Sequence, residues 1–109
     1  HGTIAGAIGL YDVDRERGRA DVGYWLARKY VGRGIMTRAL RALCAHAFAE
    51  RGLSRIRLYS AVDNEASRAL AERVGFRFVR ILPRRLPSAH GAVDAALYVL
   101  RRDDAVGQS

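Results

Sequence analysis

A short glycine-bearing loop is the segment of this sequence best suited to bind an anion. It consists of Arg28, Lys29, Tyr30, Val31, Gly32, Arg33 and Gly34. A helical pattern begins directly after it, at Ile35. The first turn of a helix has unpaired backbone N–H groups and a partial positive charge, so it attracts phosphate. Glycines let the backbone approach such a guest closely, and the basic side chains add charge around it.

The loop differs from the two most familiar phosphate-binding motifs. It lacks the Gly-Lys-Ser/Thr ending of a P-loop, which disfavours a nucleoside triphosphatase. It also lacks the third glycine of the dinucleotide-binding fingerprint, and no suitable acidic residue follows a second strand. The loop therefore predicts a pyrophosphate site of another kind.

Other reactive side chains are sparse. Cys44 is the only cysteine, so no internal disulfide can form. It falls in an apolar helical pattern, which predicts a buried and inert thiol. The histidines His1, His46 and His90 show no metal-ligand spacing, and we expect no metal site.

The loop lies within a series of predicted strands and helices. We expect strands over residues 3–10, 20–26, 55–62, 76–82 and 92–100, and helices over residues 35–51 and 65–74. Asp63 or Asn64 would cap the second helix, and Gly52 and Gly75 would end the two helices. Residues 83–91 hold both prolines and predict a loop. The order predicts one α/β domain over residues 1–102, followed by a polar tail over residues 103–109.

The net charge of +8 suits an anionic partner: nucleic acid, an acidic surface or a phosphorylated ligand. An arginine-rich proteome would explain the charge equally well, because Lys29 is the only lysine. No apolar run approaches the roughly 18 residues of a membrane span, and no signal peptide is visible. We expect a cytoplasmic protein.

Two motifs together resemble those of the GNAT acetyltransferases. The first comprises Gly23-Tyr24-Trp25-Leu26, Tyr30-Val31-Gly32-Arg33-Gly34 and Ala39-Leu40; the second comprises Asn64-Glu65-Ala66-Ser67 and Val74-Gly75-Phe76. The resemblance covers about residues 3–102 and is closest to the branch that acetylates the N-termini of ribosomal proteins. It implies a mixed, mostly antiparallel sheet flanked by helices.

The resemblance also implies acetyl-coenzyme A as the donor. The backbone of Trp25, Leu26 and Ala27 would pair with the pantetheine arm. Arg28 would lie beside the pyrophosphate. The pyrophosphate would be held by backbone N–H groups of the loop and helix start, those of Gly32, Arg33, Gly34, Ile35, Met36 and Thr37. Asn64 would face the pantetheine while capping its helix, and the Thr37 hydroxyl would assist. Arg68 would reach the adenosine phosphate, or it is a solvated helix charge.

For catalysis the resemblance implies two residues, Asp21 and Ser67. An N-terminal α-amine has a pKa near ~7.7–8.0, so it needs only a mild base. Asp21 would supply that base; alternatively it is a surface aspartate paired with an arginine such as Arg19. Many family members use a tyrosine to protonate the leaving sulfur, but here that position is Ala71. Ser67 would replace it, or it is only a small residue near a helix start.

The family domain usually opens with a strand, two helices and another strand before the equivalent of residue 3. One wall of the family's acceptor site would be the loop over residues 83–91, with Arg84 and Arg85. Without the preceding strand, the apolar edge over residues 3–10 would seek a partner. We therefore expect a homodimer.

Three readings remain open. The first is an acetyltransferase that acts on a protein or small-molecule amine, and the second is a coenzyme-A-binding module with little catalysis. The third is a basic nucleic-acid-binding domain, which only the charge supports. Aromatic side chains on a basic sheet would strengthen it, yet most aromatics here fall at predicted core positions.

Overall fold

The computed structural model describes residues 6–26, 34–88 and 91–103 of the 109-residue chain. The elements are β1 (Gly6–Asp14), β2 (Arg19–Leu26), α1 (Ile35–Glu50), β3 (Arg55–Ala61), α2 (Glu65–Val74), β4 (Arg77–Ser88) and β5 (Gly91–Arg101). The predicted order of strands and helices is confirmed. Residues 104–109, most of the predicted tail, lie outside the described residues.

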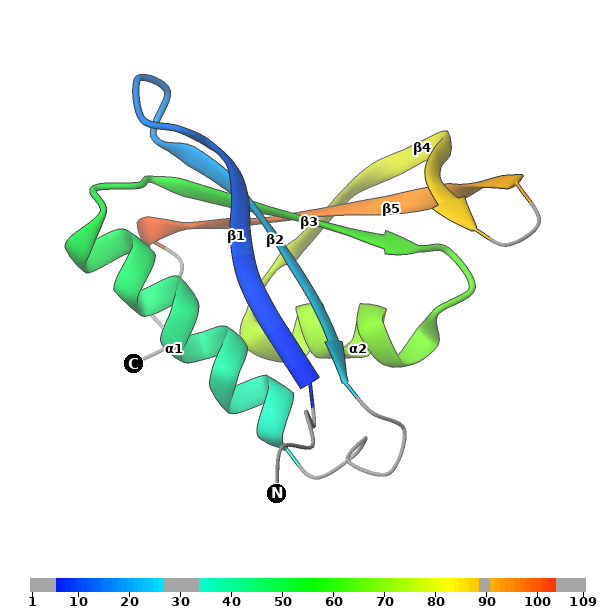
Figure 1. Cartoon of the computed structure of the whole chain (residues 1–109), viewed down its shortest axis with the longest axis horizontal. Helices are drawn as coiled ribbons and strands as arrows, with labels where there is room; N and C mark the ends of the chain where they lie inside the picture. The colour runs from blue at the N-terminus through cyan, green and yellow to red at the C-terminus, as the bar shows by residue number, and fades with distance from the viewer. Residues whose placement is uncertain (1–5, 27–33, 89–90, 104–109) are drawn as a thin grey trace.

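The strands form one mixed sheet in the order β1-β2-β3-β5-β4. Strands β2 and β3 pair in parallel, whereas the other neighbouring pairs are antiparallel. Both helices lie on one face of the sheet, and no described helix covers the other (Figure 1). We call this uncovered side the open face.

The core lies between the helices and the sheet. Alternate strand residues point into it, among them Ala20, Val22, Ile56 and Leu58. The buried side of α1 recurs at spacings of three and four residues, through Met36, Leu40, Cys44, Ala47 and Phe48. The Cys44 thiol is buried as predicted, and burial raises its pKa to about 12.

The helix ends follow the sequence signals closely. Asn64 caps α2 by accepting a hydrogen bond from the backbone N–H of Ser67 at 3.1 Å. Gly75 ends α2 in the left-handed conformation, with φ 111°. Gly52 follows the end of α1 with φ 67°. At these positions glycine avoids the steric cost that a Cβ atom would bring.

The predicted loop over residues 83–91 is wrong for most of its length, because β4 continues to Ser88. Pro83 and Pro87 lie within this strand. The sheet order places β4 at an edge, where a residue without an N–H can leave its outer side unpaired. The register shifts between Leu82 and Leu86, and Arg84 there has φ 52°.

The first hairpin also differs from the prediction. The strand predicted over residues 3–10 continues to Asp14, and residues 3–5 lie outside the described residues. The connection to β2, residues 15–18, is therefore shorter than the gap between the two predicted strands. Within the described part of the chain, no helix is long and apolar enough to cross a membrane.

Candidate active site

Strands β2 and β3 separate about halfway along their length. They pair only from Arg19↔Arg55 to Val22↔Leu58. Beyond that point β2 stays paired with β1 as far as Leu26, and β3 stays paired with β5 as far as Ala61. The two facing backbone edges therefore lack a strand partner within the described residues (Figure 1). We call this opening the split; it can accept an extended ligand by backbone pairing.

Helix α1 begins beside the end of β2. Its N-cap, Gly34, has φ 73°, and among the described residues no side-chain cap bond is made at this position. No acidic residue lies in that turn either. The first N–H groups of α1 and their partial positive charge are therefore suited to an anion.

An arginine from α2 reaches the first turn of α1. Arg73 Nη1 donates a hydrogen bond to Thr37 Oγ1 at 3.3 Å. Arg41 Nη2 donates to the Arg73 carbonyl oxygen at 3.0 Å, which ties the same two helices together. A guanidinium thus lies beside the anion-binding end of α1.

Helix α2 begins shortly after β3 ends, on the other side of the split. Ser67 lies half-buried in its first turn, and Ala71 is fully buried one turn later. Arg68 Nε donates to Tyr98 Oη at 3.0 Å, and Arg68 Nη1 donates to the Val62 carbonyl at 3.2 Å. The hydrogen bond to Tyr98 raises the pKa of the Arg68 guanidinium.

On the open face, Asp21 lies next to the start of the split. Only 1% of it is exposed, and Oδ1 accepts a hydrogen bond from Arg57 Nε at 2.7 Å. This bond raises the pKa of Arg57. Asp21 Oδ2 makes no hydrogen bond within the described residues. The alternative that Asp21 pairs with an arginine is confirmed, but Asp21 is buried and its partner is Arg57, not Arg19, because parallel register places Arg57 directly opposite.

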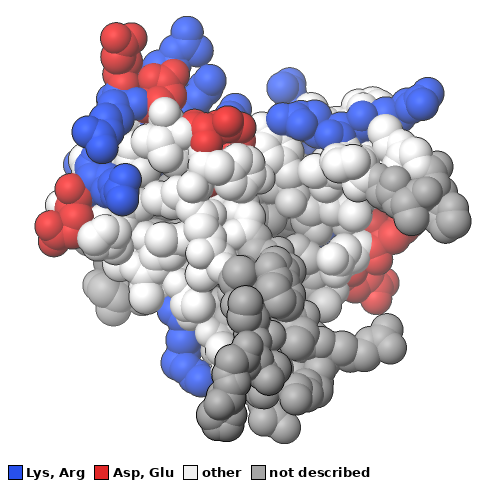
Figure 2. All heavy atoms as spheres, in the orientation of Figure 1, with Lys and Arg blue, Asp and Glu red and all other residues white. Residues whose placement is uncertain are grey.

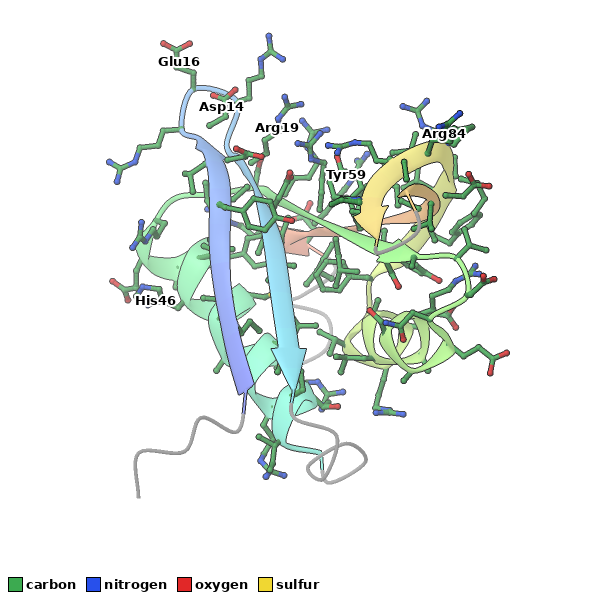
Figure 3. The ribbon with its side chains drawn as sticks, turned by 45° about the vertical axis from the view of Figure 1, so that its right-hand side comes forward. Asp14, Glu16, Arg19, His46, Tyr59 and Arg84 are labelled. Atoms are coloured by element: carbon green, nitrogen blue, oxygen red, sulfur yellow. The ribbon has the colours of Figure 1, made fainter. Side chains whose placement is uncertain are left out.

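Two tyrosines frame this carboxylate. The Tyr11 ring lies against Gly23, where an added Cβ would come within 2.8 Å of Tyr11 Cε1. Burial, followed by the nearby charge of Asp21, raises the pKa of Tyr11. Tyr59 follows the last β2–β3 pair on β3, and the Arg85 guanidinium lies 4.7 Å from its ring centroid. In Figure 3, Tyr59 lies between β3 and the bend of β4.

Comparison with known families identifies the protein family of the chain that contains this split. The profile of the family described as "Acetyltransferase (GNAT) domain" matches residues 1–77 of the chain. The chain belongs to the GNAT acetyltransferase family. The resemblance seen in the sequence is thereby confirmed.

Individual GNAT relatives agree with this assignment. The chain is 44% identical over 75 residues to "Putative ribosomal N-acetyltransferase YdaF" of Bacillus subtilis (strain 168), covering 69% of this chain and 41% of the relative. It is 36% identical over 74 residues to the ribosomal-protein-serine acetyltransferase of Escherichia coli (strain K12), covering 67% and 41% respectively. Mycobacterium smegmatis RimJ, solved in complex with CoA-disulfide, superposes with a TM-score of 0.87 at 30% identity. That match covers 98% of this chain and 54% of RimJ.

The chain thus spans about two fifths of the length of the two curated GNAT relatives. Several predicted coenzyme-A residues lie outside the described residues: Ala27, Arg28, Gly32 and Arg33. Trp25 and Leu26 end β2 at the split, and Gly34, Ile35, Met36 and Thr37 form the N-cap and first turn of α1. The structure therefore places these described residues around one opening.

The remaining predicted residues divide between the split and the packing of the sheet. Asn64 and Ser67 lie at the α2 start beyond β3. The hydrogen bonds of Arg68 join α2 to Tyr98 of β5 and to Val62. Within the described residues, no group of three or more His, Cys, Asp or Glu side chains could hold a metal ion.

Sequence reasoning missed four residues of this GNAT site or gave them no role: Tyr11, Arg57, Tyr59 and Arg73. For the first three residues, the alternation of side chains along a strand could have indicated their position. Each is out of phase with the apolar residues of its strand, which predicts the face opposite the core. Nothing in the sequence pairs Arg73 with Thr37, because that contact depends on how α2 lies across α1.

Proposed function

We propose that the protein transfers an acetyl group from acetyl-coenzyme A to a primary amine, the α-amine at the N-terminus of a protein. The observation that carries this proposal is the split between β2 and β3, with the first turn of α1 beside it. A backbone edge suits the amide-bearing pantetheine arm, and a helix start suits the pyrophosphate.

The chain has groups suited to bind each part of acetyl-coenzyme A. The backbone of Trp25, Leu26 and Ala27 would pair with the pantetheine arm, facing Asn64. The N–H groups of residues 33–37 would hold the pyrophosphate, with Gly32 and Arg28 in the same loop. Arg73 would add a cation there, because its guanidinium already contacts the first turn of α1. Arg68 remains the proposed partner of the adenosine phosphate.

Bound acetyl-coenzyme A supplies the acetyl group as a thioester, and the chain manages the protons. The acceptor amine must be neutral to attack, and an α-amine is already partly so at neutral pH. Asp21 would accept its proton at Oδ2 through water, while Arg57 holds Oδ1. Ser67 would donate a proton to the departing sulfur, since Ala71 has no hydroxyl.

The names of the relatives support a protein acceptor. One curated relative is named a putative ribosomal N-acetyltransferase, and another a ribosomal-protein-serine acetyltransferase. An N-terminal amine of a ribosomal protein is therefore the first acceptor to test.

The test has two parts. Calorimetric titration with coenzyme A should show saturable binding. Incubation with acetyl-coenzyme A and peptides that have a free N-terminus should add one acetyl group, placed on the α-amine by tandem mass spectrometry. A lysine side chain in the same peptide is the internal control, because its higher pKa keeps it protonated.

A second candidate is a coenzyme-A-binding module with little catalysis. It is favoured by Ala71 at the family's tyrosine position and by the ion pair that occupies one oxygen of Asp21. Coenzyme A binding without transfer to any peptide would select it.

A further inference from the structure

Arginines line the open face of the sheet. Strand register puts Arg19, Arg55 and Arg101 directly beside one another on β2, β3 and β5. Arg80 lies on the same face further along, since it pairs with Leu97, and Leu97 pairs with Tyr59. We define the arginine surface as Arg19, Arg55, Arg57, Arg80, Arg85 and Arg101. Figure 3 shows Arg19 and Tyr59 on the side of the sheet away from α1 and α2.

The charge of this surface is largely unmatched. Asp21 pairs with Arg57, but the side chains of Arg19, Arg55, Arg80 and Arg101 make no hydrogen bond or ion pair within the described residues. Like charges on neighbouring strands, about 4.7–4.9 Å apart, destabilise a sheet. A bound anionic partner would offset this repulsion.

Acidic side chains nearby balance it only in part: the charge of Asp12, together with Asp21, acts on Arg57. Asp14 and Glu16 project from the tip of the β1–β2 hairpin (Figure 3), and Asp14 pairs with Arg17. Asp103 lines a recess of about 480 Å³ with Ser54, Arg55, Arg101 and Arg102, yet forms no ion pair there within the described residues. In Figure 2, basic side chains gather over the hairpin and over β4, and the acidic ones among them lie at the hairpin.

The arginine surface leads to the split. Tyr59, with Arg85 over its ring, is the first residue of β3 beyond the last β2–β3 pair. A molecule that brings an amine to the split across the open face must therefore pass these arginines. We propose that the arginine surface binds an acidic acceptor polypeptide through its Asp and Glu carboxylates. The acceptor role rests on the proposed function.

The spacing of the arginines predicts the spacing of the carboxylates. Arg55 and Tyr59 are four residues apart on β3, or about 13 Å at ~3.3 Å per residue. An extended acceptor would cover the same length with four residues. One carboxylate would meet Arg80 and Arg85, and another about four residues later would meet Arg19, Arg55 and Arg101. Arginine is suited to both because its planar fork binds carboxylates bidentately.

A nucleic acid fits this surface less well. Single-stranded RNA is bound by stacking bases on accessible aromatic rings. The Arg85 guanidinium lies over the Tyr59 ring, and Phe78 and Tyr98 pair with each other, with Tyr98 buried in the core on the helix side. The arginines are thus available to anions, whereas the aromatic ring beside the split is occupied.

The experiment compares two peptides that differ only in charge. Each has a free N-terminal serine and a fluorescein at its C-terminus; one has two Glu residues four positions apart, and its twin has Gln at both. Anisotropy titrations use the whole chain with coenzyme A present. The Glu peptide should bind on the order of tenfold more tightly, since several exposed ion pairs each add a modest share. The difference should shrink as salt is raised.

Charge-reversal variants place the effect on the surface. Arg80→Glu and Arg101→Glu should each reduce the preference for the Glu peptide several-fold. The matched control is Arg51→Glu, which changes the net charge equally at the end of α1, on the other side of the sheet. Equal affinity for both peptides, or an equal loss in Arg51→Glu, would overturn the proposal.

Two further outcomes are separable. An oligouridylate that binds more tightly than the Glu peptide and loses affinity in Arg80→Glu would assign the surface to nucleic acid, which overturns the proposal. A clear Glu preference without coenzyme A binding or acetyl transfer would leave the acidic-peptide surface standing and would refute the proposed function.

Discussion

Arg73 Nη1 lies 3.3 Å from Thr37 Oγ1, so the last turn of α2 supplies a guanidinium to the first turn of α1. Residues far apart in sequence are thereby joined at the end of α1 that faces the split. The contact couples the positions of the two helices. It also places a fixed positive charge beside N–H groups that already favour an anion.

We predict that Arg73→Met weakens coenzyme A binding on the order of tenfold, the loss expected for one charge-assisted hydrogen bond to phosphate. Isothermal titration calorimetry measures it directly. Arg51→Met, on the far end of α1, is the control and should bind as the parent does. Unchanged affinity in Arg73→Met would assign this arginine to helix packing alone.

The N-cap of α1 allows a sharper test of the pyrophosphate site. Gly34 and Gly52 flank α1 with similar left-handed conformations, φ 73° and φ 67°. Valine at either position should cost at least about 1–2 kcal/mol of stability. Only Gly34→Val should also abolish coenzyme A binding, because Gly34 lies at the anion-binding end. Equal binding by both folded variants, compared by thermal melts and calorimetry, would remove the pyrophosphate site from α1.

Ser67 should matter to turnover more than to binding. We expect Ser67→Ala to lower the acetylation rate by roughly 10²-fold, the low end for a positioned proton donor. Coenzyme A affinity should stay the same, since the backbone N–H of Ser67 still bonds to Asn64. Ser54→Ala is the matched control, because its hydroxyl bonds to the Gly18 carbonyl at the opposite end of β3. A rate within twofold of the parent would leave Ser67 no role beyond the helix cap.

Variants of the buried pair Asp21–Arg57 distinguish a catalytic role of Asp21 from a structural one. Asp21→Asn and Arg57→Met both break the 2.7 Å ion pair. Each should cost about 1–3 kcal/mol, less than a fully buried pair because Arg57 is partly exposed. Asp21→Asn should in addition lower the rate by about 10²-fold. Equal rate losses in the two folded variants would show that the pair only supports the sheet.

The sequence predicted most clearly those features that local chemistry determines. Helix α2 runs over Glu65–Val74 as expected, because Asn64 and Gly75 mark its ends independently of the rest of the fold. The order of elements and the family followed from motifs of the same local kind. Strand β4 was underestimated, since prolines disfavour a strand unless it lies at an edge, and edge position belongs to the sheet as a whole.

The candidate site was predictable only in part, for a related reason. Asp21 was named as a candidate base, but its partner Arg57 depends on the parallel register of β2 with β3. Tyr59 and Arg85 meet because β4 bends at the register shift between Leu82 and Leu86. Such contacts join segments that no local pattern links, so they require the assembled sheet.

The two edges of this sheet are protected unequally. At one edge, β4 has Pro83, Pro87 and two register shifts, all of which discourage pairing with another strand. At the other edge, β1 pairs only with β2 among the described residues. Its residues 6–10 carry no charge, lysine or proline, and Tyr11 and Val13 are exposed.

We therefore predict that the chain self-associates through β1 and that a twofold dimer is the simplest closed form. Static light scattering over a range of concentrations should show a mass rising above 12.1 kDa. Gly9→Lys should shift the chain toward the monomer, because lysine on an edge opposes pairing and an added side chain there meets nothing within 4 Å. Ala49→Lys, on an exposed position of α1, adds the same charge and should leave the mass unchanged. A folded parent chain that stays at 12.1 kDa at every concentration would show that the β1 edge is closed to pairing.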